Sequence, residues 1–210
     1  MKKISQLFVA WCLAKSEKTD ESSYGKIKRK LFSNVSGKIL EIGPGTGINL
    51  KYYPKNIKWI GIEPNNEMIK YLKEKAKKLK IDYKIIRTNA EKIPIKNNSI
   101  DFVISTLVLC SVDNQEKVLS EIKRVLKKNG KFLFIEHVAD KKETFRRQIQ
   151  NLAPKTPWKF FSDNCRPNRE TWKSINNLGF KKVQIEHFNL KGVNPLIFIF
   201  KPHIIGVAQK

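Results

Sequence analysis

The stretch EIGPGTG, residues 41–47, decides the fold class of this 210-residue chain. It follows the β-branched run Lys38–Ile42, so we expect a buried strand, a glycine-rich turn and then a helix. Glycines in such a turn let a ligand approach backbone amides at a helix N-terminus. The third glycine is Gly47, whereas the dinucleotide pattern GxGxxG needs glycine at position 48, which is Ile48. No Lys-Ser or Lys-Thr pair follows, which excludes a P-loop.

Acidic residues stand beside this loop at two expected strand ends. Glu41 comes directly before the glycines, where a carboxylate repels a pyrophosphate and attracts an ammonium or sulfonium group. S-adenosylmethionine (SAM) carries both cations, so the loop favours SAM. Glu63 follows 22 residues later and suits a ribose diol, which fits NAD as well as SAM. A turn without a ligand and a solvent-exposed acid are the simpler alternatives.

Two further strand ends belong to the same expected site. After the third strand, Asn89 and Ala90 offer a short polar side chain and a backbone amide that suit an adenine rim, although an ordinary loop explains them equally well. Thr106 closes the fourth strand and is a further candidate for cofactor binding. Open α/β sheets bind ligands beyond the carboxyl ends of their strands, so these residues are expected to converge.

Short apolar runs alternate with amphipathic helical stretches, which predicts an α/β domain. We expect a Rossmann-like, mostly parallel sheet with helices on both faces, and a last strand that inserts antiparallel beside the fifth. Residues 1–34 are expected to form N-terminal cap helices, and residues 35–210 the main domain. Within it, residues 139–167 are either an insertion on the substrate side or a packed surface loop. The helix before the fifth strand is expected to stop at Asn129-Gly130. The seven expected strands are 38–42, 58–62, 82–87, 101–106, 131–137, 180–188 and 203–208.

The net charge of +23 and the isoelectric point near 10.0 first suggest a polyanionic partner. However, 35 of the 42 basic residues are Lys, and Asn (17) and Ile (25) are also abundant. These three residues share A/T-rich codons, so a biased genome produces the same excess. Because the lysines are spread along the whole chain, we favour solvated faces over a weakly anion-seeking surface, and we expect no nucleic-acid partner.

The cysteines and the N-terminus bear on the compartment. Cys12, Cys110 and Cys165 are odd in number and show no CxxC spacing, which favours a reduced, cytoplasmic setting and indicates no zinc site. The apolar stretch Ile4–Ala14 is too short to span a bilayer. We interpret it first as a lid or cap helix, next as an interfacial helix with peripheral membrane contact, and last as a signal peptide.

The segments EIGPGTG, GIEPN, NAEKIP, SIDFVIST and KRVLKKNGKFLFIEH together resemble class I SAM-dependent methyltransferases. Within this superfamily the chain is similar to the branch of the quinone-biosynthesis enzymes, and most of all to the methyltransferase-like thiol S-methyltransferases, which are membrane-attached in animals. That second resemblance rests on Ser105–Val112, Glu136–Val138, the neighbourhood of Asp163–Cys165, and Lys201–Ala208.

The resemblance covers roughly residues 20–208 and implies a set of cofactor-binding residues. In this set the ribose is held by Glu63, and the adenine lies at Asn89 and Ala90. The animal members have a longer hydrophobic N-terminal anchor than Ile4–Ala14. The residues implied to hold the rest of SAM are Glu41, Gly43, Gly45 and Gly47.

Methyl transfer from a sulfonium is an in-line displacement, which chiefly needs orientation and a deprotonated nucleophile. A thiol with a pKa near 8.5 is partly ionised at neutral pH, so it needs little help from a base. His137 and Cys110 lie at or past two strand ends and are the catalytic candidates, against a structural histidine and a small buried apolar residue. No His, Asp or Glu cluster has metal-ligand spacing, so metal-independent transfer is expected. The substrate-side candidates are Asp163, Cys165, Arg169 and Trp158.

Other functions compete with S-methylation of a small molecule. Among acceptors, quinone or phenol-type rings rank after thiols. A nucleic-acid methyltransferase is disfavoured because the (N/D)PP(Y/F) tetrad of base-amino methylation is absent after the fourth strand, where residues 105–108 read STLV. A non-catalytic SAM- or lipid-binding protein and a nicotinamide dehydrogenase rank lower still.

Overall fold

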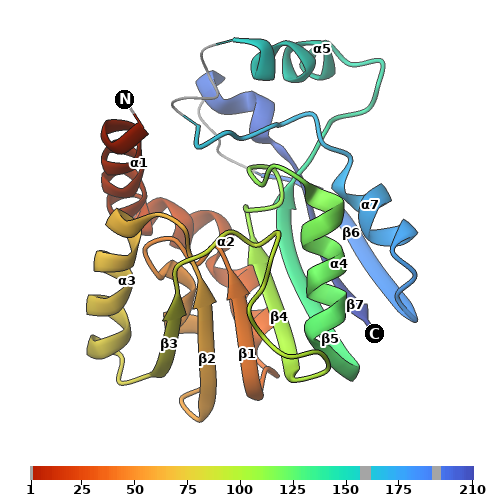
Figure 1. Cartoon of the computed structure of the whole chain (residues 1–210). Coiled ribbons are helices and arrows are strands. Elements are labelled where there is room, and N and C mark those ends of the chain that lie inside the picture. The colour runs from red at the N-terminus through yellow and green to blue at the C-terminus, as the bar shows by residue number, and fades with distance from the viewer. Residues whose placement is uncertain (1, 157–161, 191–194) are drawn as a thin grey trace.

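One seven-stranded sheet runs through the structure, a computed structural model that describes residues 2–156, 162–190 and 195–210 (Figure 1). Its strands lie in the order β3-β2-β1-β4-β5-β7-β6. The strands from β1 to β5 are parallel, and β7 runs antiparallel between β5 and β6, which confirms the predicted topology. The bounds are β1 (Gly37–Ile42), β2 (Ile57–Ile62), β3 (Asp82–Ile86), β4 (Ile100–Thr106), β5 (Leu126–His137), β6 (Lys182–Asn189) and β7 (Pro202–Gln209).

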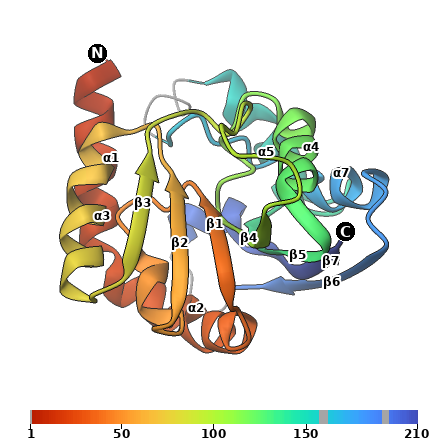
Figure 2. The same cartoon turned by 60° about the horizontal axis from the view of Figure 1, so that its bottom comes forward.

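Helices cover both faces of the sheet because the central strands are apolar on both sides (Figure 2). Ile39 belongs to the apolar cluster that α2 and α3 cover, whereas Leu40 and Ile42 belong to the cluster under α4 and α7. The helical elements are α1 (Lys2–Lys15), α2 (Glu17–Phe32), η1 (Ile48–Tyr52), α3 (Asn66–Lys78), α4 (Gln115–Val125), α5 (Phe145–Leu152), η2 (Ala153–Lys155), α7 (Thr171–Asn177) and η3 (Pro195–Phe200).

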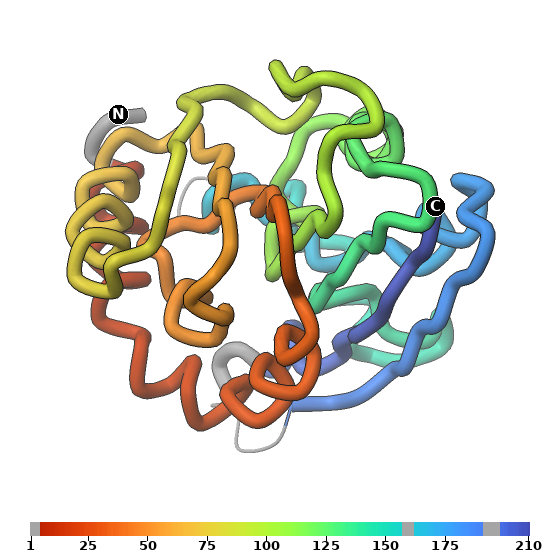
Figure 3. The backbone as a smooth tube through the Cα atoms, turned by 90° about the horizontal axis from the view of Figure 1, so that it is seen from below, coloured from red at the N-terminus to blue at the C-terminus, as the bar shows by residue number. Residues whose placement is uncertain are grey.

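The N-terminal segment forms the helices α1 and α2, and α1 stands beside α3 at the edge of the sheet (Figure 1). Ala10 is buried in this packing, and Asn65 Nδ2 donates a hydrogen bond to Gln6 O at 3.3 Å. The two ends of the chain lie on opposite sides of the molecule (Figure 3). Within the described ranges, no helix has the length and apolar character that crossing a bilayer requires.

Two helix predictions were wrong in detail. After the glycine turn there is only the 3₁₀ segment η1, because Tyr53 is extended and Pro54 follows it. The helix expected to stop at Asn129-Gly130 ends at Val125 instead. Leu126 is fully buried and pairs with Ile100, so tertiary packing draws it into β5 and ends the helix early.

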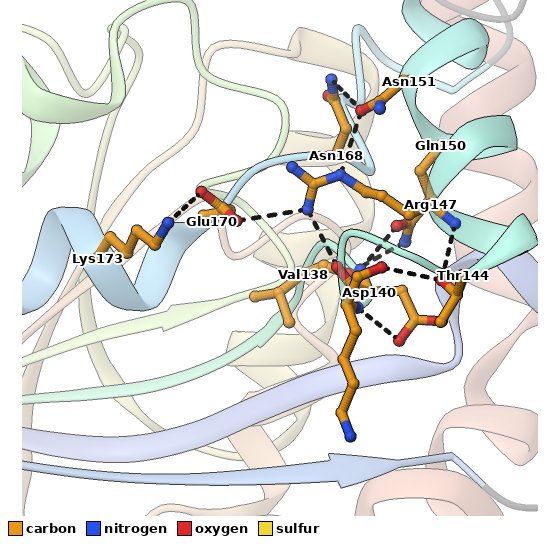
Figure 4. A network of polar contacts seen from close by, with 10 residues as sticks. Val138, Asp140, Thr144, Arg147, Gln150, Asn151, Asn168, Glu170 and Lys173 are labelled. Carbon is orange, nitrogen blue, oxygen red and sulfur yellow. Dashed lines mark hydrogen bonds and ion pairs between the residues drawn. The ribbon is translucent and has the colours of Figure 1, made fainter.

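Residues 139–167 contain α5, which lies above the carboxyl ends of the parallel strands (Figure 1). A fully buried amide side chain fastens this segment to the domain (Figure 4). Gln150 Nε2 donates to Val138 O at 3.1 Å and to Ile199 O at 2.7 Å, while Gln150 Oε1 accepts from Asp140 N at 2.7 Å. Arg147 Nη1 adds a bond to Asp140 O at 3.1 Å. Residues 139–156 are therefore held beside the strand ends.

Candidate functional site

The glycine turn lies at the carboxyl end of β1 and requires glycine for two separate reasons. Gly43, Gly45 and Gly47 all have positive φ angles, of 58°, 55° and 79°, where other residues are strained. A Cβ on Gly43 would also lie 2.7 Å from Val108 Cγ2. The turn thus brings its backbone close to the residues after β4, and it leaves the Gly45 amide for an acceptor side chain.

That acceptor is Glu63, at the carboxyl end of β2. Its Oε2 accepts from Gly45 N at 3.0 Å and its Oε1 accepts from Asn65 N at 2.8 Å, so it joins the glycine turn to the start of α3. The side chain is 4% exposed. Burial raises the pKa of the Glu63 carboxyl to about 7; the two amide hydrogen bonds oppose the rise and the negative charge of Asp163 adds to it.

Glu41 lies under the turn and is 1% exposed. It accepts hydrogen bonds from Asn49 Nδ2 at 2.8 Å, from Tyr53 Oη at 2.9 Å and from Trp59 Nε1 at 2.9 Å. Burial raises the pKa of Glu41, and these three bonds oppose the rise. The side chain therefore holds η1 and β2 together below the turn, and its negative charge acts on the Glu63 carboxyl.

Buried polar atoms near the turn lack partners and point to a ligand. Asn49 Nδ2 also donates to Thr106 Oγ1 at 3.1 Å, which ties η1 to the end of β4. In the part of the chain that the structure describes, Asn49 Oδ1 and Thr46 Oγ1 are buried without a hydrogen-bond partner. Unsatisfied buried acceptors are costly, so a polar ligand group beside the turn would stabilise them. This fits the polar amino-acid end of SAM.

The remaining cofactor candidates follow β3. Ala90 is buried against the apolar cluster under α4, while the Asn89 side chain is exposed. In the adjoining turn, Ile93 N donates to Glu121 Oε2 at 2.7 Å, which fixes the loop on α4. The Ala90 backbone and the Asn89 side chain are thus placed at the expected edge of the sheet.

Three further candidates, two at strand ends and one in the segment after α5, meet in one buried cluster. His137 Nε2 lies 3.0 Å from Cys165 Sγ, and one ring nitrogen of His137 and the two Sγ atoms of Cys110 and Cys165 all lie within 4.8 Å of one another. All three side chains are buried. A hydrogen bond with Cys165, together with burial, raises the pKa of the Cys110 thiol well above its ordinary value. We refer to Cys110, His137 and Cys165 as the Cys-His-Cys cluster.

Glu136 fixes the turn that carries Cys110. It is fully buried and accepts from Ser105 Oγ at 2.6 Å, from Leu109 N at 3.1 Å and from Val108 N at 3.3 Å. Sequence reasoning missed this role. A signal was present, because a carboxylate next to the last residue of an otherwise apolar strand needs partners when it is buried.

The segment that carries Cys165 is tied to the same turn. Arg166 N donates to Cys110 O at 3.0 Å. The Arg169 guanidinium donates to Leu109 O and, at 2.6 Å, to Val112 O. Arg169 thus lies beside the cluster, whereas Asp163 is exposed and its negative charge acts on Glu63. Trp158 lies outside the described residues.

Known proteins share this architecture. The sequence model of a family described as a methyltransferase domain matches residues 40–134. Thiol S-methyltransferase TMT1A of Homo sapiens is 36% identical over 195 residues, which is 87% of this chain and 78% of the human protein. The chain belongs to the thiol S-methyltransferase family. A second member, TMT1B of Mus musculus, is 36% identical over 97% of the chain and 84% of its own length.

Solved structures agree on the fold of this thiol S-methyltransferase family member. A SAM-dependent methyltransferase of Thermotoga maritima, described as a possible histamine N-methyltransferase, matches with a TM-score of 0.70. It covers 100% of both chains at 21% identity. The chain is accordingly a class I SAM-dependent methyltransferase with SAM as its cofactor, which confirms the sequence-based identification.

The pKa of Glu63 predicts how stability changes with pH. Because the folded-state pKa of about 7 lies above the ordinary value of 4.5, protonated Glu63 favours the folded protein. This contribution is complete below pH 4.5 and is lost as the pH rises through 7. Relative to Glu63→Gln, wild type is expected to lose about 3 kcal/mol of unfolding free energy between those limits. Urea unfolding at several pH values measures the difference.

The matched control for that series is Glu74→Gln, on the exposed face of α3. This substitution removes a glutamate carboxylate that does not contact Glu63 or the glycine turn. The unfolding free energy of this variant is therefore expected to change with pH as that of wild type does. Parallel curves for Glu63→Gln and wild type would contradict the raised pKa.

Proposed function

We propose that this enzyme transfers the methyl group of SAM to the sulfur of a small thiol. The observation that carries the proposal is the position of the Cys-His-Cys cluster, at the carboxyl ends of β4 and β5, next to the glycine turn at the end of β1. The order β1-β4-β5 makes these strand ends neighbours. The names of the human and mouse relatives, thiol S-methyltransferases, support the same acceptor.

SAM supplies an electrophilic methyl group on a sulfonium sulfur. On the protein, the Gly45 backbone and Glu63 would hold the ribose, since a carboxylate accepts two hydrogen bonds from a diol. Thr46 and Asn49 would meet the amino-acid end with their unpartnered oxygens. The adenine would lie against the loop that contains Ala90. Glu41 and Thr106 brace this arrangement from below through Asn49.

The residues around the Cys-His-Cys cluster suit a thiol acceptor, which is uncharged until it loses its proton and becomes a thiolate. Cys110 and His137 would meet the acceptor sulfur in a buried, water-poor place. The Arg169 guanidinium lies beside the turn that carries Cys110, and its positive charge would favour a thiolate acceptor there. Partial ionisation of thiols at neutral pH leaves little for a separate general base to do. The three free cysteines also suit a reducing, cytoplasmic compartment.

A methyl-transfer screen tests this function. Purified protein and methyl-labelled SAM are mixed in turn with a small thiol, a phenol and a quinol. We expect label in the thiol product, because a thiol is ionised more readily than a phenol at neutral pH. Transfer to the phenol or the quinol without transfer to the thiol would contradict the proposed acceptor.

The cofactor assignment is tested separately by Glu63→Ala. Loss of two hydrogen bonds to a charged acceptor costs about 1.5–3 kcal/mol each, so we expect SAM affinity to fall at least about 100-fold. Calorimetric titration measures the affinity, and circular dichroism checks the fold. Glu74→Ala on the exposed side of α3 is the control and should bind as wild type does. Unchanged affinity in Glu63→Ala would remove Glu63 from the cofactor site.

Peripheral membrane contact is a further part of the proposal. Phe8 and Trp11 of α1 are 52% and 54% exposed, and the chain carries a net charge of +23. An exposed apolar face on a basic protein suits the surface of an anionic membrane.

We expect the double variant Phe8→Ser/Trp11→Ser to reduce co-sedimentation with phosphatidylserine vesicles roughly tenfold or more. The reason is that burial of each ring in the membrane contributes about 1.5–3 kcal/mol to the binding free energy. Phe145→Ser on α5, 72% exposed, is the control. Equal sedimentation of all three proteins would contradict this contact.

A further inference from the structure

The Cys-His-Cys cluster has the composition of a metal site. Its three members come from different parts of the chain: the turn after β4, the last residue of β5, and the segment before α7. Two thiols and an imidazole are the side chains that Zn²⁺ prefers. All three are buried, so water does not compete strongly for them. Local sequence spacing could not have indicated such a site, because the ligands are brought together only by the sheet.

The distances are compatible with one zinc ion. With bonds of about 2.3 Å to sulfur and about 2.0–2.1 Å to nitrogen, tetrahedral ligand atoms lie roughly 3.5–3.8 Å apart. In the structure His137 Nε2 and Cys165 Sγ are 3.0 Å apart, and one ring nitrogen of His137 and the two Sγ atoms all lie within 4.8 Å of one another. Side-chain shifts of less than about 1 Å would bring these atoms to zinc distances.

The number of ligands distinguishes a catalytic from a structural site. Structural zinc has four protein ligands, whereas catalytic zinc has three and an open position, and Cys₂His is one of the known catalytic sets. Among the described residues, no further His, Cys, Asp or Glu joins the cluster. A zinc ion bound here would thus have three protein ligands of these kinds, the number that catalytic sites have.

We propose that Cys110, His137 and Cys165 bind Zn²⁺ and that the acceptor thiol takes its fourth position as a thiolate. This rests on the proposed function, since it names how that acceptor is bound and activated. Zinc lowers the pKa of a coordinated thiol and keeps the sulfur deprotonated. The cluster would thus act as a binding site for soft nucleophiles, which selects thiols over phenols and quinols.

The reaction balances without another reactant. The acceptor R–SH releases its proton to solvent on binding zinc. Its sulfur then forms a bond to the methyl carbon as the bond from that carbon to the sulfonium sulfur breaks. The electron pair of the broken bond stays on the departing sulfur, which becomes a neutral thioether. The methylated product R–S–CH₃ is also a neutral thioether, a weaker zinc ligand than a thiolate, so it leaves the metal.

The local charges support this arrangement. Zn²⁺ with two cysteine thiolates is neutral, and a third thiolate from the substrate would make the site −1. Arg169 places a positive charge beside the cysteines, and its guanidinium is fixed by Leu109 O and Val112 O. When the acceptor is bound, the positive charge of Arg169 offsets the negative charge of the acceptor thiolate.

The experiment uses the full chain purified from zinc-supplemented cells. We expect close to one zinc per chain by mass spectrometry of the metals. We also expect Co²⁺ replacement to produce a thiolate-to-cobalt absorption band that grows when 2-mercaptoethanol is added. In Cys110→Ser and Cys165→Ser, zinc affinity should fall by more than the roughly 10- to 100-fold that changes outside the ligand set cost. Cys12→Ser, at a half-buried cysteine of α1, should keep the wild-type affinity.

The outcomes separate this inference from the proposed function. Competition against a chromophoric chelator measures zinc affinity on the wild-type chain, so the test survives even if a variant fails to fold. Protein that binds no zinc, or that is isolated with a Cys110–Cys165 disulfide, would overturn the metal site. Undiminished thiol methylation by chelator-stripped protein would overturn the zinc-bound acceptor. In each case a normal calorimetric SAM titration and thiol methylation would leave the proposed function standing; failure of those two measurements would remove the proposed function itself.

Discussion

Buried glutamates at the carboxyl ends of three parallel strands hold the functional turns of this enzyme. The turns that follow the parallel strands carry backbone amides, and these amides need acceptors once they are removed from water. Glu63 supplies one at the glycine turn, and Glu136 supplies another at the turn with Cys110. Glu41 takes side-chain donors instead, from η1 and β2. Burying these carboxylates is costly, and the hydrogen bonds offset that cost only while the turns keep their present shape.

This constraint links the two halves of the site. Glu63 and Glu41 hold the segments that follow β1 and β2, where the cofactor is proposed to lie. Glu136 accepts hydrogen bonds from the neighbouring turn after β4, and Arg169 donates hydrogen bonds to the carbonyls of the same turn. The side chains at the two strand ends are therefore positioned by the same kind of interaction. A change in any of these carboxylates is expected to disturb a turn before it disturbs the sheet.

Side-chain contacts hold the segments that cover the strand ends. The N-terminal helix α1 approaches the glycine turn, where a Cβ on Gly45 would lie 3.9 Å from Leu13 Cδ1. On the acceptor side, the buried Gln150 fastens α5 to the backbone of Val138. Both covers therefore rest on side chains, whereas the turns beneath them are fixed to strands.

The sequence by itself determined the fold class, the antiparallel place of the last strand beside the fifth, and the cofactor. Alternating apolar runs, three glycines in EIGPGTG and an acid at position 63 are local patterns, and each has a local physical meaning. The helix boundaries at Val125 and after η1 were predicted less well, because burial of Leu126 and an extended Tyr53 override local propensity there. Only the tertiary structure decided that Cys110, His137 and Cys165 form one cluster. The sheet order places β4 beside β5, and a distant segment folds over both, so the cluster depends on contacts that no spacing along the chain encodes.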